Sequence, residues 1–182
     1  MRLNKMNKLS NKKIELINAY GPYNHAVWNS QGLKISNEER VSGRVELLAK
    51  KIRECILKNF TLDEIKKLSI VDVGYYDGWI LQELSDLPFS RIVGIEPRER
   101  NIIKGKMIRE LLGIESKIEF RIGDISSLGN QKFDIVICTG VLHHCESISL
   151  AIYNLSSICI RMSLLRQLFF HLNILQVLQK RN

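Results

Sequence analysis

Carboxylates and glycines that could hold a small ligand follow apolar segments of this chain. Asp72 lies in the first such segment, and the turn after it contains Gly74 and Gly78 before a helical pattern starts at Trp79. A tight glycine turn between a strand and a helix lets backbone N–H groups face a nucleotide-like ligand, and the helix start adds unpaired donors. Tyr76 stands where a dinucleotide-binding turn would have its middle glycine. The turn therefore predicts a cofactor pocket but disfavours NAD or FAD, and with them a nucleotide-binding oxidoreductase.

Acidic residues also follow the next two apolar segments. Glu96 comes 24 residues after Asp72, close to the spacing at which a carboxylate accepts the hydroxyls of a ribose. Asp124, which Ile125 follows, could accept a hydrogen bond from an exocyclic amine such as that of adenine. Asp72 could orient the turn or accept a hydrogen bond from a cationic ligand. Plainer roles stay open, because Glu96 could be a turn acid before Pro97 and Asp124 could cap a short helix.

A fourth apolar segment leads to Gly140, and His143 and His144 follow it closely. Histidine titrates near neutral pH, so His144 could act as a general base toward a substrate oxygen or nitrogen, or it could be structural. We do not expect a metal site here. Adjacent residues on one short segment rarely converge on a single ion, and the sequence has no second ligand cluster.

These residues need a scaffold that brings the ends of separate segments together. Apolar segments alternate with helical patterns through the middle of the chain. Such alternation predicts an α/β fold with a parallel sheet, helices on its faces and right-handed crossovers, and ligands bind such sheets at the carboxyl ends of the strands. The expected strands are 69–73, 91–95, 117–122 and 133–138, and the expected helices are 37–58, 78–87, 98–112 and 147–160.

Length and composition are those expected of one globular domain with a modest extension. The chain has 182 residues, of which 45% are hydrophobic and 25% charged, and no apolar run is long enough to cross a membrane. The four cysteines show no C-x-x-C pairing, which favours a reducing, cytoplasmic location over a disulfide framework. The net charge is +8, and lysines precede the first acid, Glu15. They could contact RNA or simply be solvated.

Taken in order, the four segments resemble the motifs of the class I S-adenosylmethionine-dependent methyltransferases. Residues 71–78 are similar to the first motif of that family, 92–97 to the second, 121–125 to the third and 133–144 to the fourth. The second acid of the family holds the ribose and the third lies by the adenine. His144 matches a histidine that recurs in a subgroup with tRNA wobble-uridine modifying transferases and many small-molecule methyltransferases. The resemblance implies S-adenosylmethionine as cofactor, bound by Asp72, Gly74, Gly78, Glu96, Asp124, Ile125 and Gly140.

The activity that the resemblance implies is methyl transfer to a small-molecule or RNA nucleophile, with tRNA as one candidate partner. Positioning would supply much of the rate, because the methyl group of a sulfonium is already activated. The alternative is a non-catalytic, cofactor-binding remnant of the same fold. Residues 1–60 are expected to form an N-terminal helical extension, 61–160 the methyltransferase domain and 161–182 a helical tail, since leucines recur there at helical spacing.

The sequence departs from the pattern of the family in two places. The family usually has seven strands, and the last of them would be missing here, as in a truncated chain. Segment 133–138 would then lie at the sheet edge, where a second copy of the chain could pair with it as a homodimer. In the glycine turn, Tyr75 and Tyr76 replace small residues of the family and would crowd the pocket.

Overall fold

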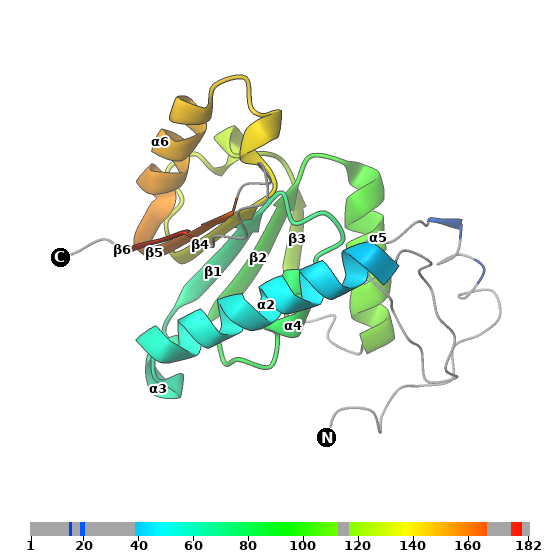
Figure 1. Ribbon diagram of the computed structural model, residues 1–182, viewed down its shortest axis with the longest axis horizontal. Coiled ribbons are helices and arrows are strands. Elements are labelled where there is room, and N and C mark those ends of the chain that lie inside the picture. Colours follow the sequence, from blue (N-terminus) through cyan, green and yellow to red (C-terminus); the bar gives the residue numbers. More distant parts are fainter. Residues whose placement is uncertain (1–14, 16–18, 21–38, 113–116, 167–175, 180–182) are drawn as a thin grey trace.

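The computed structural model describes residues 15, 19–20, 39–112, 117–166 and 176–179. Within these residues, helices surround a six-stranded sheet with the order β3-β2-β1-β4-β5-β6 (Figure 1). The strands are β1 Ser69–Val73, β2 Arg91–Glu96, β3 Glu119–Ile122, β4 Phe133–Thr139, β5 Cys159–Arg166 and β6 Gln176–Gln179. The helices are α2 Glu39–Asn59, α3 Leu62–Ile65, α4 Trp79–Glu83, α5 Glu99–Leu112 and α6 Ile148–Ile158, with 3-10 turns η1 at Ser126–Leu128 and η2 at Leu142–His144.

The first five strands run parallel, as the alternating pattern predicts. β1 lies between β2 and β4, so that Asp72 is opposite Gly94 on one side and Ile137 on the other. The chain therefore has the predicted Rossmann-like α/β fold, with the carboxyl ends of β1 to β4 at one edge of the sheet. Of the expected N-terminal extension, the structure describes α2, Phe60 and residues 15 and 19–20, whereas residues 1–14, 16–18 and 21–38 lie outside the described part.

Apolar side chains cover both faces of the sheet. On one face, Ile52 and Ile56 of α2 and Leu81 of α4 pack against strand residues such as Ile70 and Ile135, all of them fully buried. Figure 1 shows α2 lying across the strands on this side. On the other face, a second cluster joins Val71, Val93 and Val136 of the strands to Ala151, Leu155 and Ile158 of α6. Helices on both faces leave the strand ends as the accessible part of the parallel sheet.

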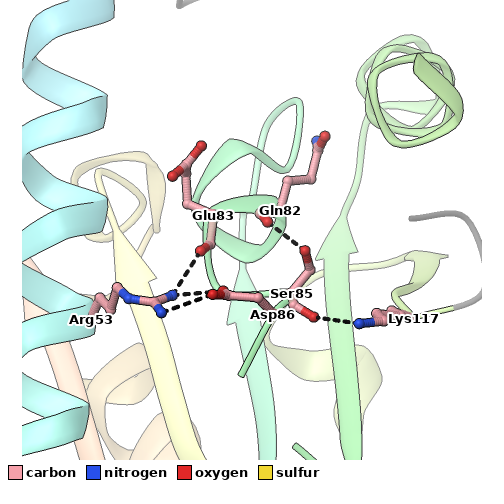
Figure 2. A network of polar contacts seen from close by, with 6 residues as sticks. All are labelled: Arg53, Gln82, Glu83, Ser85, Asp86 and Lys117. Carbon is pink, nitrogen blue, oxygen red and sulfur yellow. Dashed lines mark hydrogen bonds and ion pairs between the residues drawn. The ribbon is translucent and has the colours of Figure 1, made fainter. Parts of the chain in front are cut away.

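A polar network fastens α2 to the segment around α4 (Figure 2). The guanidinium of Arg53 donates to both carboxylate oxygens of Asp86, at 2.6 and 2.9 Å, and to the carbonyl of Glu83 at 3.3 Å. From the other side, the ammonium of Lys117 donates to the carbonyl of Ser85 at 3.3 Å. The helix after the glycine turn is short, and these contacts fix the chain that leaves it.

The expectation of a helical tail over 161–182 is wrong where the structure describes it. Residues up to Arg166 form β5, which pairs in parallel with β4, and Gln176–Gln179 form β6, which pairs antiparallel with β5. Met162, Ser163 and Leu164 are all buried. A strand covered on both faces is apolar at successive positions, and periodicity alone cannot distinguish it from a buried helix.

The expected exposure of the fourth strand is also wrong, because β4 lies between β1 and β5 in the sheet. Two of the strands expected to be missing are therefore present. The reason for expecting a second copy of the chain at β4 falls away with this pairing. Among the described helices, none has the length and apolar character that crossing a membrane requires.

Candidate functional site

The segments that the sequence singles out meet at the carboxyl edge of the sheet. The N–H of Gly74, just after β1, donates to the carbonyl of Ile95 in β2 at 2.7 Å. The N–H of Gly123, just after β3, donates to the carbonyl of Glu96 at 3.1 Å. From the end of β4, the side chain of Val141 packs on Gly74. The four predicted segment ends are thus joined by direct contacts.

Left-handed backbone conformations shape the turn after β1. Gly74, Tyr76 and Gly78 have φ angles of 73°, 57° and 80°, and Gly140 after β4 has 74°. Tyr76 is the non-glycine residue of this group, and a left-handed conformation costs a side-chain-bearing residue about 1–2 kcal/mol. Gly78 precedes the first residue of α4, as the expected strand–turn–helix order requires.

The Tyr75 ring is buried in the core against a residue of β3. It is 5% exposed and stacks on Phe120 of β3, with 4.6 Å between ring centroids. Gly94 of β2 makes room for the pair, since a Cβ there would lie 2.7 Å from Tyr75 and 2.8 Å from Phe120. The guanidinium of Arg109 lies 5.2 Å from the centroid of the Phe120 ring. The ring of Tyr75 is thus held in the core by Phe120 and is not exposed at the turn.

The Tyr76 ring lies beside α5 between two cations. The guanidinium of Arg98 is 5.6 Å and the ammonium of Lys104 is 5.1 Å from the ring centroid, and that ammonium also donates to the Tyr76 hydroxyl at 3.4 Å. Cations over a ring face are attracted by its quadrupole. These contacts offset part of the cost of the left-handed backbone at Tyr76.

The carboxylate of Glu96 is completely buried and accepts several hydrogen bonds. Its Oε1 accepts from Arg98 Nε at 2.8 Å, from Asn101 Nδ2 at 2.9 Å and from the Arg98 backbone N–H at 3.2 Å. Its Oε2 accepts from the backbone N–H of Tyr76 at 3.2 Å. Oε1 is thus occupied by α5 and the residues before it, and Oε2 remains the oxygen with capacity for a further donor.

Asp72 is 1% exposed, and neither of its carboxylate oxygens has a hydrogen-bond partner in the described part of the chain. Burial raises its pKa to about 8, and the nearby charge of Glu96 acts in the same direction. A buried acid without a donor is costly in its charged form. This carboxyl is therefore suited to a cationic group that a ligand would bring.

Asp124 holds its own turn together. Its Oδ1 accepts from the backbone N–H groups of Ser126 and Ser127 and from the Ser126 hydroxyl, at 2.8, 3.1 and 2.6 Å. The Ser126 hydroxyl is the main cause that lowers the pKa of Asp124. The Asp124 side chain thus caps a short helix, η1, which is the plainer of the two roles considered for it. All three bonds end on Oδ1, so they leave Oδ2 unused. Ile125 beside it is buried.

The two histidines lie in η2 with exposed side chains. Their rings are 3.9 Å apart between centroids, and the backbone N–H of His144 donates to the carbonyl of Val141 at 2.8 Å. Burial, and then the neighbouring His144, lowers the pKa of His143. No group of three or more potential metal ligands occurs among the described residues.

Sequence reasoning missed Arg98 and Asn101, the side chains that hold Glu96. Both stand at the start of a segment with a helical pattern, two and five residues after the acid. An acid followed at this distance by donors in the first turn of a helix is a signal that could have identified them. Val141 was missed as well, since a valine after a strand carries no such signal.

Comparison with known proteins agrees with this geometry. A methyltransferase domain family matches residues 71–159. The chain is 29% identical over 155 residues to the ubiquinone biosynthesis O-methyltransferase of Rickettsia typhi, a match covering 84% of this chain and 56% of that protein. It is 28% identical over 98 residues to the tRNA U34 carboxymethyltransferase of Campylobacter hominis, covering 49% of this chain and 30% of that protein. The chain spans about half or less of the length of these relatives.

Solved structures share the fold. The magnesium protoporphyrin IX methyltransferase of Synechocystis PCC 6803 with bound S-adenosylmethionine matches with a TM-score of 0.58 at 24% identity, over 65% of this chain and 56% of that one. The N-terminal domain of EvdMO1 with bound S-adenosylhomocysteine matches with a TM-score of 0.67 at 19% identity, over 86% of this chain and 65% of that one.

The sheet order, the glycine turn and the acids at the strand ends define a Rossmann-like domain built around a nucleotide-like cofactor. Residues 71–159 match a methyltransferase domain family, and the fold is shared with solved methyltransferase structures that hold S-adenosylmethionine or S-adenosylhomocysteine.

Proposed function

We propose that this domain binds S-adenosylmethionine at the glycine turn and transfers its methyl group to a nucleophile of a small molecule. The observation that carries the proposal is the pair of buried acids on adjacent strands, Asp72 and Glu96. A ligand with an ammonium group and a ribose provides a cation for one acid and hydroxyl donors for the other.

The residues present fit this cofactor. Asp72 supplies two buried oxygens without a donor in the described part of the chain, as an ammonium group requires. Glu96 is held by Arg98 and Asn101 with Oε2 directed at the turn, where it also accepts from the Tyr76 N–H. Gly74, Gly78 and Gly140 supply backbone without side chains, and Asp124 and Ile125 would line the adenine. When bound, S-adenosylmethionine supplies a methyl group activated by its sulfonium.

The chain's own contribution to the reaction is positioning and removal of a proton. Asp72 and Glu96 would hold the cofactor in a fixed position at the turn, and this positioning would contribute much of the rate. His144, exposed beside Val141, would take the proton from the acceptor oxygen or nitrogen.

Exposed apolar side chains on the helix that follows the histidines support a small, partly apolar acceptor. Ile148, Leu150, Ile152 and Tyr153 of α6 are 42, 58, 39 and 70% exposed. In a parallel sheet, the helix after β4 begins at the carboxyl edge, on the same side as the site. Of the two relatives, the ubiquinone biosynthesis O-methyltransferase matches the larger part of this chain, 84%, and it is named for a small-molecule pathway. RNA is the other acceptor class to test.

Binding comes first in the experiment. Isothermal titration calorimetry of the wild-type chain with S-adenosylhomocysteine should show binding, and Glu96→Gln should weaken it by at least about tenfold, since one charge-assisted bond to a hydroxyl is lost. Asp63→Asn, on exposed α3 far from the site, is the matched control and should bind as wild type. Absence of binding by the wild-type chain would refute the proposal.

Transfer is tested next with S-adenosylmethionine tritiated at the methyl group. We expect incorporation into a panel of simple phenols and not into bulk tRNA. His144→Gln should lower kcat, while His143→Gln should retain it, because only His144 is assigned the proton. Binding without transfer to either acceptor class would support the non-catalytic alternative.

A further inference from the structure

Asp72 is a buried acid in the centre of the sheet, with no cation beside it among the residues that the structure describes. It lies on β1, with β2 and β4 on either side, and it is 1% exposed. Its carboxyl oxygens have no hydrogen-bond donor in the part of the chain that the structure describes. Two residues further on, at Gly74, the chain enters the turn that faces the ligand. Asp72 is thus buried in the free protein but next to the place where a ligand arrives.

The titratable groups that face Asp72 do not include a cation among the described residues. They are Glu96 from β2, Cys138 from β4 and Tyr75 from the turn. Burial, and then the neighbouring Asp72 and Cys145, raises the pKa of Cys138 to about 12, so this thiol is neutral at physiological pH. Burial also raises the pKa of Tyr75, whose hydroxyl is likewise buried without a partner among these residues.

The two acids differ in their surroundings. Glu96 accepts four hydrogen bonds, one of them from the guanidinium of Arg98 at 2.8 Å. Asp72 has no such donor among the described residues, and the negative charge of Glu96 disfavours a second charge beside it. Of this pair, Asp72 is therefore the member that keeps a proton in the ligand-free protein.

We propose that an ammonium-bearing cofactor, on binding at the glycine turn, displaces the proton of Asp72 into solvent, so that one proton leaves for each cofactor bound. The inference rests on the proposed function. The carboxylic O–H bond of Asp72 is broken, the proton goes to bulk water, and the resulting carboxylate pairs with the ammonium group, which keeps its own protons. Because binding and proton release are linked, affinity rises with pH while Asp72 is protonated in the free protein, by close to tenfold per pH unit.

Calorimetry in buffers with different ionisation enthalpies counts the protons directly. S-adenosylhomocysteine is titrated into wild-type protein and into Asp72→Asn in PIPES and in imidazole, at about pH 6.5, where the ligand's α-amino group, with a pKa of about 7.7–8, already carries its proton. We expect close to one proton released by the wild type and close to none by Asp72→Asn. Asparagine has nearly the same size and no charge to bury, so the variant should fold.

A second ligand controls for other groups. 5′-Methylthioadenosine keeps the adenosine but lacks the amine, so it should bind wild-type protein without proton release. Equal proton release with both ligands, or equal release by the wild type and Asp72→Asn, would overturn the inference. If Asp72→Asn fails to bind S-adenosylhomocysteine, the two ligands compared on the wild type decide the question. Failure of both ligands to bind wild-type protein would instead refute the proposed function.

Discussion

Val141 lies directly on Gly74. A Cβ on Gly74 would be 2.2 Å from Cγ2 of Val141, well inside any real carbon–carbon contact. The contact joins the turn after β1 to the segment after β4, two strand ends that lie 67 residues apart in the sequence. Gly74 is therefore required for two reasons, its left-handed φ of 73° and the valine that covers it.

A double-mutant cycle should separate these two reasons. Gly74→Ala is expected to cost about 3–5 kcal/mol of unfolding free energy, of which about 1–2 kcal/mol comes from the left-handed backbone. In a Val141→Ala background the steric part should vanish and only the backbone part should remain. Urea unfolding of the four proteins measures the coupling. A Gly74→Ala cost unaffected by Val141→Ala would show that the valine is not what excludes a side chain.

Removal of the Phe120 ring should loosen the turn as well as the core. Phe120→Ala takes away the ring on which Tyr75 stacks and should cost about 2–4 kcal/mol of stability. Phe89→Ala is the matched control, since Phe89 is also half-buried against the same core cluster. Both variants should lose stability in urea unfolding, but only Phe120→Ala should weaken binding of S-adenosylhomocysteine in calorimetry. Equal effects of the two variants on affinity would contradict this role of the stack.

Asn101 is expected to act as a positioning residue for Glu96. Its amide donates to Oε1 at 2.9 Å, and Asn101→Ala should weaken the binding of both S-adenosylhomocysteine and 5′-methylthioadenosine by about tenfold, because Glu96 then loses its fixed orientation. Asp72→Asn, in contrast, should affect only the ligand with the amine. Asn154→Ala on α6 serves as the control for loss of an asparagine. Unchanged affinity for both ligands in Asn101→Ala would exclude the role.

Stability should fall with rising pH because of Asp72. The folded chain keeps this proton up to a pKa of about 8, whereas an unfolded aspartate loses it near its ordinary value of 3.8. Between these values the folded state binds more protons, so the free energy of unfolding decreases as pH rises. The advantage of Asp72→Asn over wild type should grow by about 2–3 kcal/mol between about pH 5.5 and 7.5. Urea unfolding at a series of pH values measures it, and a difference independent of pH would contradict the protonated state.

The local pattern was sufficient for the first four strands, the turn and the acids at the strand ends. Asp72, Gly74 and Gly78 follow each other within one segment, so a strand–turn–helix junction could be inferred from neighbouring residues. The alternation of segments then implied a parallel sheet, and a parallel sheet places Glu96, Asp124 and Gly140 at one edge. None of these steps requires knowledge of contacts between distant residues.

Only the tertiary structure decided which side chains face one another. The Tyr75 ring turns to Phe120 because Gly94, on a neighbouring strand, leaves space for it. The apolar residues after 160 form a strand because they pair with β4 at the side that β1 does not occupy. Local periodicity does not reveal this pairing. Asp72 and Glu96 look alike in the sequence, but Arg98 and Asn101 supply donors to one and no described residue supplies them to the other. The charge of a buried acid depends on such partners, so the sequence determined where the acids lie and the fold determined which of them is supplied with donors.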